Sequence, residues 1–363
     1  MSGDVRWSRG AVSAQSRCCI VAHGARTPVG LSAPSSAAAV RAGISRLGGH
    51  PRFYDIDGEA FVVGMDRTLE EFDSRRRMLA LSISALDECL AELPTSKGVT
   101  VPVFLGVRDA AFGFTKADAE WLADGLSRAM QPRCKALIRV VVGGSAAGLV
   151  AVQQARVAVE SGAVPLAIAG GVDSHLDPGF LERLDEAGRC KSVGNKWGFP
   201  PGEGAGMLAI CSLSTARGIR RPSLADIVAD GAAIESAFYG SDLVCTGEGL
   251  TSAIHDALGG LSWPSEAVST TYCDINGEFH RTEEFMYATQ RLPANAFQAI
   301  ETYVAPADCW GDVGAASGPL FAALAIESGR RGYSKGPHAL LWAASDSGQR
   351  ASLLLRIPSN EAR

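Results

Sequence analysis

Two stretches of the chain carry the same order of apolar and polar positions. Residues 145–162 and residues 315–329 are apolar almost all round a helical axis, which predicts two buried helices. Each is followed by two short apolar runs typical of buried strands, at 165–174 and 204–211 in the first case and at 338–347 and 351–358 in the second. The two units begin 170 positions apart. A duplication of this length predicts two similar α/β halves that pack on each other, with a site where they meet.

Apolar runs alternate with amphipathic segments along the rest of the chain. The pattern predicts strands at 18–22, 101–106, 136–142, 225–234 and 267–274, and helices at 37–47, 116–130, 250–258, 282–289 and 297–303. Such alternation predicts an α/β fold in which helices cover both faces of the sheets. We divide the chain into a flexible tail (1–17), an N-terminal half (18–213) and a C-terminal half (214–363).

Composition narrows the class of protein. The 363 residues are 47% hydrophobic and 20% charged, with a net charge of −5, so we expect no broad basic surface for nucleic acid. No apolar run reaches about 18 residues, so we expect no membrane span. The first residues contain no apolar run, so we expect no secretory signal. The nine cysteines show no CxxC spacing, and several lie in apolar runs. They predict core thiols in a cytoplasmic protein without disulfides, a metal or another cofactor.

The sharpest local motif is VVVGGSAAG at residues 140–148. A β-branched run ends in two glycines, which allow a sharp turn, so Ser145 is expected at the N-terminus of the following buried helix. A polar side chain there is a candidate nucleophile, although a serine that caps a helix is the commoner case. The G-x-S-x-A pattern is also similar to the nucleophile elbow of α/β-hydrolases, but a later acid and histidine are not evident and the duplication does not suit that fold.

Two further patterns receive structural interpretations. Asp173, His175 and Asp177 alternate at a spacing that metal ligands use, but we interpret them as a loop between a strand and a helix. Residues 75–77 form an arginine run after three acids, which we interpret as a solvated helix face.

Polar residues also gather in two segments of the predicted C-terminal half. Residues 272–284 concentrate acids and His280 just after a strand, and Asp312 stands directly ahead of the second buried helix. In a duplicated fold the starts of the two central helices face each other. Asp312 is therefore expected near Ser145.

Several motifs together resemble the thiolase superfamily and, within it, the β-ketoacyl-acyl-carrier-protein synthases. They are ARTPVG at 25–30, LAIAGGVDS at 166–174, PGEGAGMLAI at 201–210 and GDVGAASG at 311–318. The similarity extends over residues 18–357. It implies a thiolase-like, duplicated five-layered α/β/α/β/α fold.

That family condenses acyl thioesters with a cysteine at the start of a buried helix, two histidines and a lysine. The resemblance places the cysteine at Ser145, the first histidine within 274–276, the second at Asp312 and the lysine near Ala307. A phenylalanine of the family's last glycine-rich loop falls near Asp346. Every one of these positions has changed. A serine hydroxyl needs a base and a carboxylate donates no hydrogen bond to an oxyanion, so the resemblance implies that condensation is lost.

The leading hypothesis is a homodimeric, thiolase-fold pseudoenzyme that acts as an adaptor or scaffold. The motifs CWGDVGAASGP and DINGE resemble a subgroup encoded beside bacterial type VI secretion genes for effector loading. A secretion effector or an acyl carrier protein is therefore the expected protein partner. The family also implies a homodimer in which the strand after the nucleophile helix pairs across a two-fold axis.

The alternative hypothesis is a serine-dependent acyltransferase or acyl hydrolase. Ser145 would be its nucleophile and His280 the base, with Asp274 or Asp312 to orient the histidine. A His280 nitrogen within about 2.6–3.2 Å of the hydroxyl would favour this hypothesis. A third hypothesis is ligand binding without turnover.

All three hypotheses predict one polar pocket where the halves meet. The catalytic candidates are Ser145, Asp274, His280 and Asp312, and the binding candidates are Glu278, Trp310 and Asp346. Their carboxylates repel one another, so we expect compensation by charged His280 and by arginines such as Arg281 or Arg350 in a solvated pocket. Loss of Asp312 should relieve this repulsion and leave folding intact, at a cost of about 1 kcal/mol or less if the group is partly exposed.

Overall fold

The two apolar units of the sequence form the centre of the fold. The computed structural model describes residues 17–94, 98–110 and 113–358, and the predicted tail therefore lies almost wholly outside the described residues. Helices α4 (Ala147–Glu160) and α10 (Ser317–Arg330) have equal length, and each follows a 3-10 turn, η3 (Gly144–Ala146) or η5 (Gly314–Ala316). Helix α10 is buried along almost its whole length, whereas α4 leaves one side exposed.

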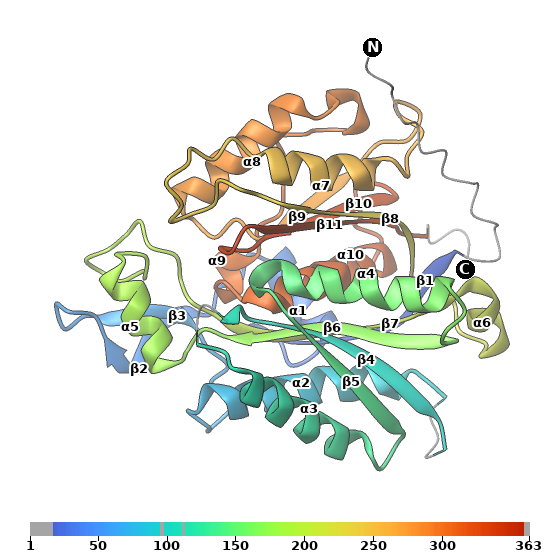
Figure 1. Cartoon of the computed structure of the whole chain (residues 1–363), viewed down its shortest axis with the longest axis horizontal. Coiled ribbons are helices and arrows are strands. Elements are labelled where there is room, and N and C mark those ends of the chain that lie inside the picture. Colours follow the sequence, from blue (N-terminus) through green and yellow to red (C-terminus); the bar gives the residue numbers. More distant parts are fainter. Residues whose placement is uncertain (1–16, 95–97, 111–112, 359–363) are drawn as a thin grey trace.

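One sheet of nine strands folds over these helices, in the order β5-β4-β6-β7-β1-β8-β11-β10-β9. The strands are β1 (Cys18–Arg26), β4 (Thr100–Val107), β5 (Lys135–Val142), β6 (Leu166–Ser174), β7 (Glu203–Ser212), β8 (Ala225–Ile234), β9 (Thr270–Cys273), β10 (His338–Ala344) and β11 (Gln349–Arg356). Strands β1 and β8 share only two residue pairs. At this joint the sheet divides into two leaves, one on each side of α4 and α10 (Figure 1).

The outer faces of both leaves are covered by helices. Helices α2 (Ser74–Ala91) and α3 (Lys116–Met130) lie on the first leaf, and α7 (Glu248–Leu258) and α8 (Phe279–Arg291) lie on the second (Figure 1). The predicted α/β/α/β/α fold is therefore confirmed. The remaining elements are α1 (Ala33–Arg41), the hairpin β2 (Leu47–Tyr54) and β3 (Ala60–Gly64), α5 (Pro178–Glu186), α6 (Leu213–Gly218), η4 (Ala294–Ala296) and α9 (Ala307–Trp310).

The two leaves have similar strand orders, as expected for a duplication. The first leaf runs β5-β4-β6-β7-β1 from its edge to the joint, and the second runs β9-β10-β11-β8. Val304 bridges Tyr272 of β9 in parallel, at the place that β5 holds beside β4. The proposed division between 213 and 214 falls one residue inside α6, just after β7 ends, and it stays a prediction.

The starts of the two central helices touch through their backbones. A Cβ atom on Gly148 would overlap the carbonyl oxygen of Ala315, and one on Gly318 would overlap the Leu149 side chain. Residues 145–148 and 315–318 therefore occupy equivalent places in the two halves. This contact brings Ser145 and the segment around Asp312 together, as the duplication predicted.

Three local predictions are wrong. Residues 297–303 are not helical, because the Val268 N–H donates to the Ala296 carbonyl and the Gln298 N–H donates to the Val268 carbonyl, which ties this segment to the region before β9. The segment 37–47 is divided between the end of α1 and the start of β2.

The third error concerns the arginine run, of which only part is solvated. Arg75 and Arg76 are exposed, but Arg77 is buried one turn inside α2. Its Nε atom donates to Glu203 Oε2 at 2.8 Å, and the Ser174 hydroxyl donates to the same oxygen at 2.9 Å. This buried pair ties α2 to the ends of β6 and β7.

Two expectations from composition can be compared with the structure. Eight of the nine cysteines are buried, which confirms their expected place in the core. No helix among the described residues is long and apolar enough to cross a membrane.

We predict that Gly171→Ala destabilises the protein by about 1–3 kcal/mol, the usual cost of overpacking. The new methyl group would meet the backbone of Ala315 and Ala316, which cannot move without shifting α10. Gly218→Ala is the matched control, because no atom lies within 4 Å of the added carbon. Urea unfolding measures both variants, and equal stability of Gly171→Ala and wild type would contradict the close contact.

Candidate functional site

A small cavity lies where the two central helices begin. Its volume is about 30 Å³, enough for no more than a water molecule or two. Three predicted residues line it, namely Ser145, Asp312 and Asp346. The other polar residues on its wall include Arg108, Asp173, His175, Arg189 and Arg281.

Ser145 is buried in the turn η3 and does not cap the helix. Neither η3 nor α4 has a side-chain cap, so the N-cap interpretation is wrong. The backbone N–H of Ala146 instead donates to the hydroxyl of Ser345 at 2.9 Å, across the junction of the halves. No residue in the described part of the chain forms a hydrogen bond with the Ser145 hydroxyl. Position and burial alone therefore support Ser145 as a reactive group.

Asp312 is a buried acceptor, so the partial exposure on which the small predicted cost depended is not found. One of its carboxylate oxygens accepts the Asn276 side-chain amide at 2.8 Å, and the other accepts the Gly314 N–H at 2.8 Å. Backbone hydrogen bonds to Pro200 and Gly202 enclose the residue from the other side. Asp312 thus organises the turn that starts the second central helix.

Asp173 and His175 belong to this cavity, although we interpreted them as a loop. Burial opposes ionisation of Asp173, but Arg108 at 2.9 Å and His175 at 3.4 Å lower its pKa to about 2. The pKa of His175 is raised against the effect of burial, chiefly by Asp173 and also by Asp312, whose carboxylate lies 3.9 Å away. Asp177 fits the structural interpretation, because it caps α5 by accepting the Phe180 N–H at 3.1 Å.

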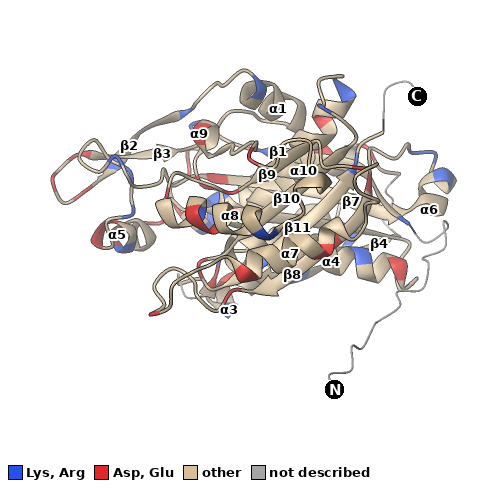
Figure 2. Ribbon diagram, turned by 90° about the horizontal axis from the view of Figure 1, so that it is seen from above, with Lys and Arg blue, Asp and Glu red and all other residues tan. Residues whose placement is uncertain are grey.

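A second ionic group lies beside the cavity. Asp346 bridges Arg281 at 3.0 Å and Arg189 at 2.8 Å, and Glu278 forms two hydrogen bonds with Arg189 at 2.7 and 2.9 Å. Despite burial, the two guanidinium groups lower the pKa of Asp346 to about 2. Figure 2 shows acidic and basic residues side by side near the start of α8.

Asp274 completes this group deeper in the protein. Its carboxylate lies 3.0 Å from Arg281 and accepts the Ala344 N–H at 2.8 Å. Burial nevertheless raises the pKa of Asp274 to about 7. The predicted role of Arg281 therefore agrees with the contacts, whereas Arg350 pairs with Glu284 instead.

The structure separates His280 and Trp310 from Ser145. His280 lines a different cavity and lies against the Tyr239 ring, with centroids 4.7 Å apart. Burial and the nearby Arg281 lower the pKa of His280 to about 4, so the expected positive charge is wrong at neutral pH. No hydrogen bond joins His280 to Ser145 among the described residues. Trp310 is buried in the central core and lines neither cavity.

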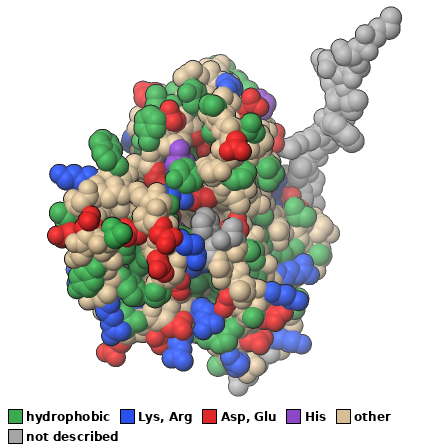
Figure 3. All heavy atoms as spheres, turned by 60° about the vertical axis from the view of Figure 1, so that its left-hand side comes forward, with side chains coloured by type: hydrophobic (Ala, Val, Ile, Leu, Met, Phe, Trp, Pro, Cys, Tyr) green, Lys and Arg blue, Asp and Glu red, His purple; other side chains and the backbone are tan. Residues whose placement is uncertain are grey.

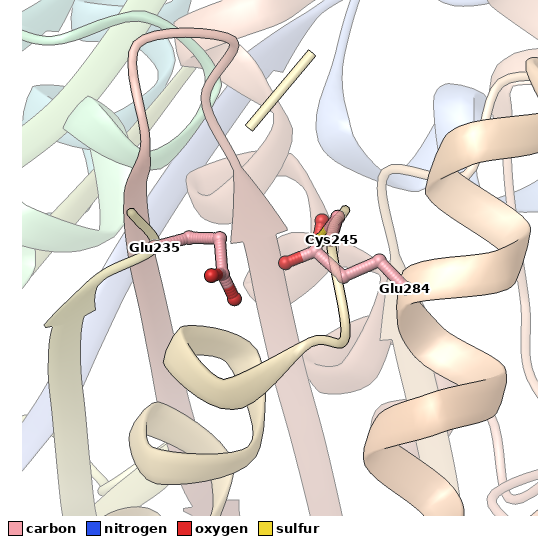
Figure 4. A group of neighbouring side chains, drawn as sticks. All are labelled: Glu235, Cys245 and Glu284. Atoms are coloured by element: carbon pink, nitrogen blue, oxygen red, sulfur yellow. The ribbon is translucent and has the colours of Figure 1, made fainter. Parts of the chain in front are cut away.

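One group of potential metal ligands lies further out, formed by Glu235, Cys245 and Glu284 (Figure 4). Glu284 already forms two hydrogen bonds with Arg350, at 2.6 and 3.0 Å, and Glu235 accepts the Gly249 N–H at 2.8 Å. The guanidinium supplies the positive charge that these acids need. We assign no metal to the group.

Sequence reasoning missed Arg108 and Arg189, two basic groups that pair with acids of the site. Arg108 follows β4 and Arg189 follows α5, so neither belongs to a motif. The sequence offered only a general indication of these arginines, because buried carboxylates at one edge of a sheet require cationic partners from neighbouring segments.

Comparison with known proteins identifies the type of fold. Residues 129–216 match the family described as beta-ketoacyl synthase, N-terminal domain. A 6-methylsalicylic acid synthase of Aspergillus niger is 31% identical over 185 residues, which are 45% of this chain and 10% of that protein. Mycoketide-CoA synthase of Mycobacterium tuberculosis is 31% identical over 192 residues, 48% of this chain and 5% of that protein. The chain thus matches a tenth or less of these relatives.

Solved structures agree over almost the whole chain. The ketosynthase from module 6 of the bacillaene synthase of Bacillus subtilis has a TM-score of 0.73 at 16% identity, over 94% of this chain and 72% of that one. A type II polyketide synthase acyl-carrier protein in complex with its ketosynthase gives a TM-score of 0.79 at 14% identity, over 94% and 99%. The chain therefore has the thiolase-like fold of ketosynthases.

We predict that Asp312→Ala costs about 1–3 kcal/mol, because two buried donors lose their acceptor. The cost should be larger at pH 5 than at pH 9. Charged His175 is stabilised by Asp312 below its unfolded pKa, and that stabilisation is lost as pH rises through its raised folded pKa. Chemical unfolding across this range measures both effects. A cost below about 0.5 kcal/mol at all pH values would show that Asp312 is not a buried acceptor.

Proposed function

We propose that this protein is a ketosynthase-fold adaptor that has lost condensing chemistry. The observation that carries the proposal is the state of the donors near Ser145. The Asn276 amide, at one of the positions where the family resemblance implies a histidine, donates to Asp312 at 2.8 Å and to Glu278 at 3.2 Å. Both of its N–H groups are therefore directed at carboxylates.

Condensation would require those donors for a different purpose. Negative charge develops on the thioester oxygen, and removal of one oxyanion donor costs about 2.7–4 kcal/mol in known enzymes. Here the second position is a carboxylate, which would repel that charge. A serine hydroxyl without a hydrogen-bonded base is also a poor nucleophile.

The size of the cavity supports the same proposal. About 30 Å³ beside Ser145 leaves no room for an acyl chain. Its wall includes the paired groups of Asp173 and Asp346, and an apolar chain would have to displace them at the cost of leaving buried charges unpaired.

The serine acyltransferase alternative has less support. His280 lines the other cavity and cannot act as the predicted base without a rearrangement of α8. His175 does line the cavity of Ser145, but its nearest polar contacts are Asp173 and Asp312. The alternative therefore needs a histidine that is already paired.

We propose a homodimer formed through strand β5. The strand we expected at a two-fold axis, β6, lies inside the sheet between β4 and β7, so that detail is wrong. Strand β5 is the open edge of the first leaf, and Leu137 on it and Val157 on α4 are exposed. An open edge with apolar neighbours favours pairing with a second copy.

We propose two candidate protein partners for the adaptor. The CWGDVGAASGP and DINGE motifs support a type VI secretion effector. An acyl carrier protein is the second candidate, because the type II ketosynthase described above was solved with one.

We predict no carbon–carbon product when the purified protein is given malonyl and acyl thioesters, either free or on a carrier protein. Ser145→Cys should be equally inactive, because a thiol does not restore the missing donors. Mass spectrometry of the products tests this. A condensation product that disappears in Ser145→Ala would overturn the adaptor proposal.

We predict a dimer by light scattering at micromolar concentration. Leu137→Glu with Val157→Glu should shift it to monomer, because like charges would meet across the two-fold axis. Ile56→Glu with Val193→Glu, at exposed positions away from β5, is the control and should remain dimeric. A wild-type monomer, or an unchanged dimer in the first variant, would contradict the β5 interface.

A further inference from the structure

Large apolar side chains are exposed on two segments of the second half that line one cavity. They come from the loop between β8 and α7, residues 235–247, and from the outer side of α8. Val244 and Phe279 are 82% and 75% exposed, and Tyr239, Leu243 and Met286 are also exposed. We call these five residues the apolar rim. Figure 3 shows hydrophobic and acidic side chains close together on the upper part of the molecule.

A cavity of about 260 Å³ opens beside the rim, between this loop and α8. Tyr239, Leu243 and Val244 line its mouth, and Glu283, Glu284 and Asp346 contribute acidic groups to its wall. Arg281 and Arg350 also line it, but both are buried and already paired. The volume suits one long side chain and excludes a folded element.

Negative charge exceeds positive charge around this cavity. The carboxyl groups are Asp274, Glu278, Glu283, Glu284 and Asp346, and the guanidinium groups are Arg189, Arg281 and Arg350. The lowered pKa of His280 leaves its ring neutral, and the raised pKa of Asp274 neutralises at most one acid. Four carboxylates then face three guanidinium groups, and Glu283 has no cationic partner among the described residues.

The rim carries two more acids, and one exposed base lies beside it, Arg291, whose guanidinium donates to the Thr246 carbonyl oxygen. Asp242 and Glu248 are exposed at the two ends of the segment that holds Leu243 and Val244, and neither forms an ion pair in the described part of the chain. The only contact of the Glu248 carboxylate there is with the Thr246 hydroxyl at 3.4 Å. The surface therefore combines apolar contact area with unbalanced negative charge.

We propose that this surface, the apolar rim with its cavity, docks a basic amphipathic segment of a partner protein. Apolar side chains of the segment cover the rim, and one lysine or arginine enters the cavity toward Glu283 and Asp346. Aromatic and aliphatic anchors around a desolvated basic side chain are the usual energetic centre of such interfaces. The inference rests on the adaptor role proposed above and specifies that the partner of the adaptor presents a basic, amphipathic segment.

Two other occupants fit less well. A second copy of the chain would place Asp242, Glu248 and Glu283 against an equally acidic surface, and the dimer is proposed elsewhere, at β5. A small polar cation would satisfy the carboxylates but leave Val244 and Phe279 exposed.

A peptide pair tests the proposal on the full-length protein. The probe is a fluorescein-labelled amphipathic 18-residue helix of Leu, Ala and Arg, and its counterpart has Glu in place of Arg. Anisotropy should show binding of the Arg peptide below about 100 μM, weakened by salt, and at least about tenfold weaker binding of the Glu peptide. Equal binding of the two peptides, or no binding of the Arg peptide, would overturn the proposal.

Matched variants locate the binding. Leu243→Ser with Val244→Ser, and separately Asp242→Asn with Glu283→Gln, should each weaken the Arg peptide by about tenfold. Glu120→Gln with Asp124→Asn makes the same change in net charge on exposed positions of α3 and should leave binding unchanged. If the α3 variant weakens binding as much as the rim variants, attraction is to net charge alone and the docking surface is refuted. Val244→Ser with Phe279→Ser provides a second rim variant should the first unfold.

This outcome is separable from the adaptor proposal. Peptide binding does not depend on whether Ser145 reacts, so a condensation product would overturn the adaptor role and leave the docking result intact. Conversely, failure of the peptide to bind removes the docking surface while the absence of condensation still stands.

Discussion

The backbone contact between the starts of α4 and α10 is the constraint on which the rest of the structure depends. Gly148 and Gly171 lie so close to Ala315 that neither position has room for a side chain. A contact of backbone on backbone leaves the two halves little freedom to slide. It therefore fixes the positions of Ser145 and Asp312, which come from opposite halves, and closes the space between them to about 30 Å³.

Burial at this junction determines what the polar residues do. A buried carboxylate without a partner is costly, so each acid requires a cation or several donors. Asp312 uses the Asn276 amide, Asp173 uses Arg108, and Asp346 uses Arg281 and Arg189. The groups that could stabilise a reacting oxygen are thereby committed to these contacts, of which the pair of Arg189 and Asp346 joins the two halves. Charge that this network leaves unbalanced lies on the outer side, at the cavity beside α8.

Much of the fold could be predicted from the chain because burial leaves a periodic pattern. The repeat at 145–162 and 315–329 located the central helices, and the extents of α3 and β8 agree with the sequence pattern. The 297–303 segment was predicted wrongly because its backbone hydrogen-bonds beside β9, so its apolar residues do not form one face of a helix. Apolar periodicity alone does not distinguish these two cases.

The site was predictable only where a motif marked it. Ser145 and Asp312 precede recognisable helices, and their proximity followed from the duplication. Arg189 and Arg108 come from segments without a motif, so their contacts with Asp346 and Asp173 depend on tertiary packing. His280 shows the converse case, because its position in an acidic block suggested catalysis while the turn of α8 directs it to Tyr239.

The most direct test of the central claim is whether Ser145 accepts an acyl group. The full-length protein, incubated with short- and long-chain acyl-pantetheine thioesters, would be measured by intact mass spectrometry and peptide mapping. The account predicts an unchanged mass, because Ser145 has no hydrogen-bonded base and no space for the acyl chain. A stoichiometric acyl adduct mapped to Ser145 would contradict it and favour a serine acyltransferase.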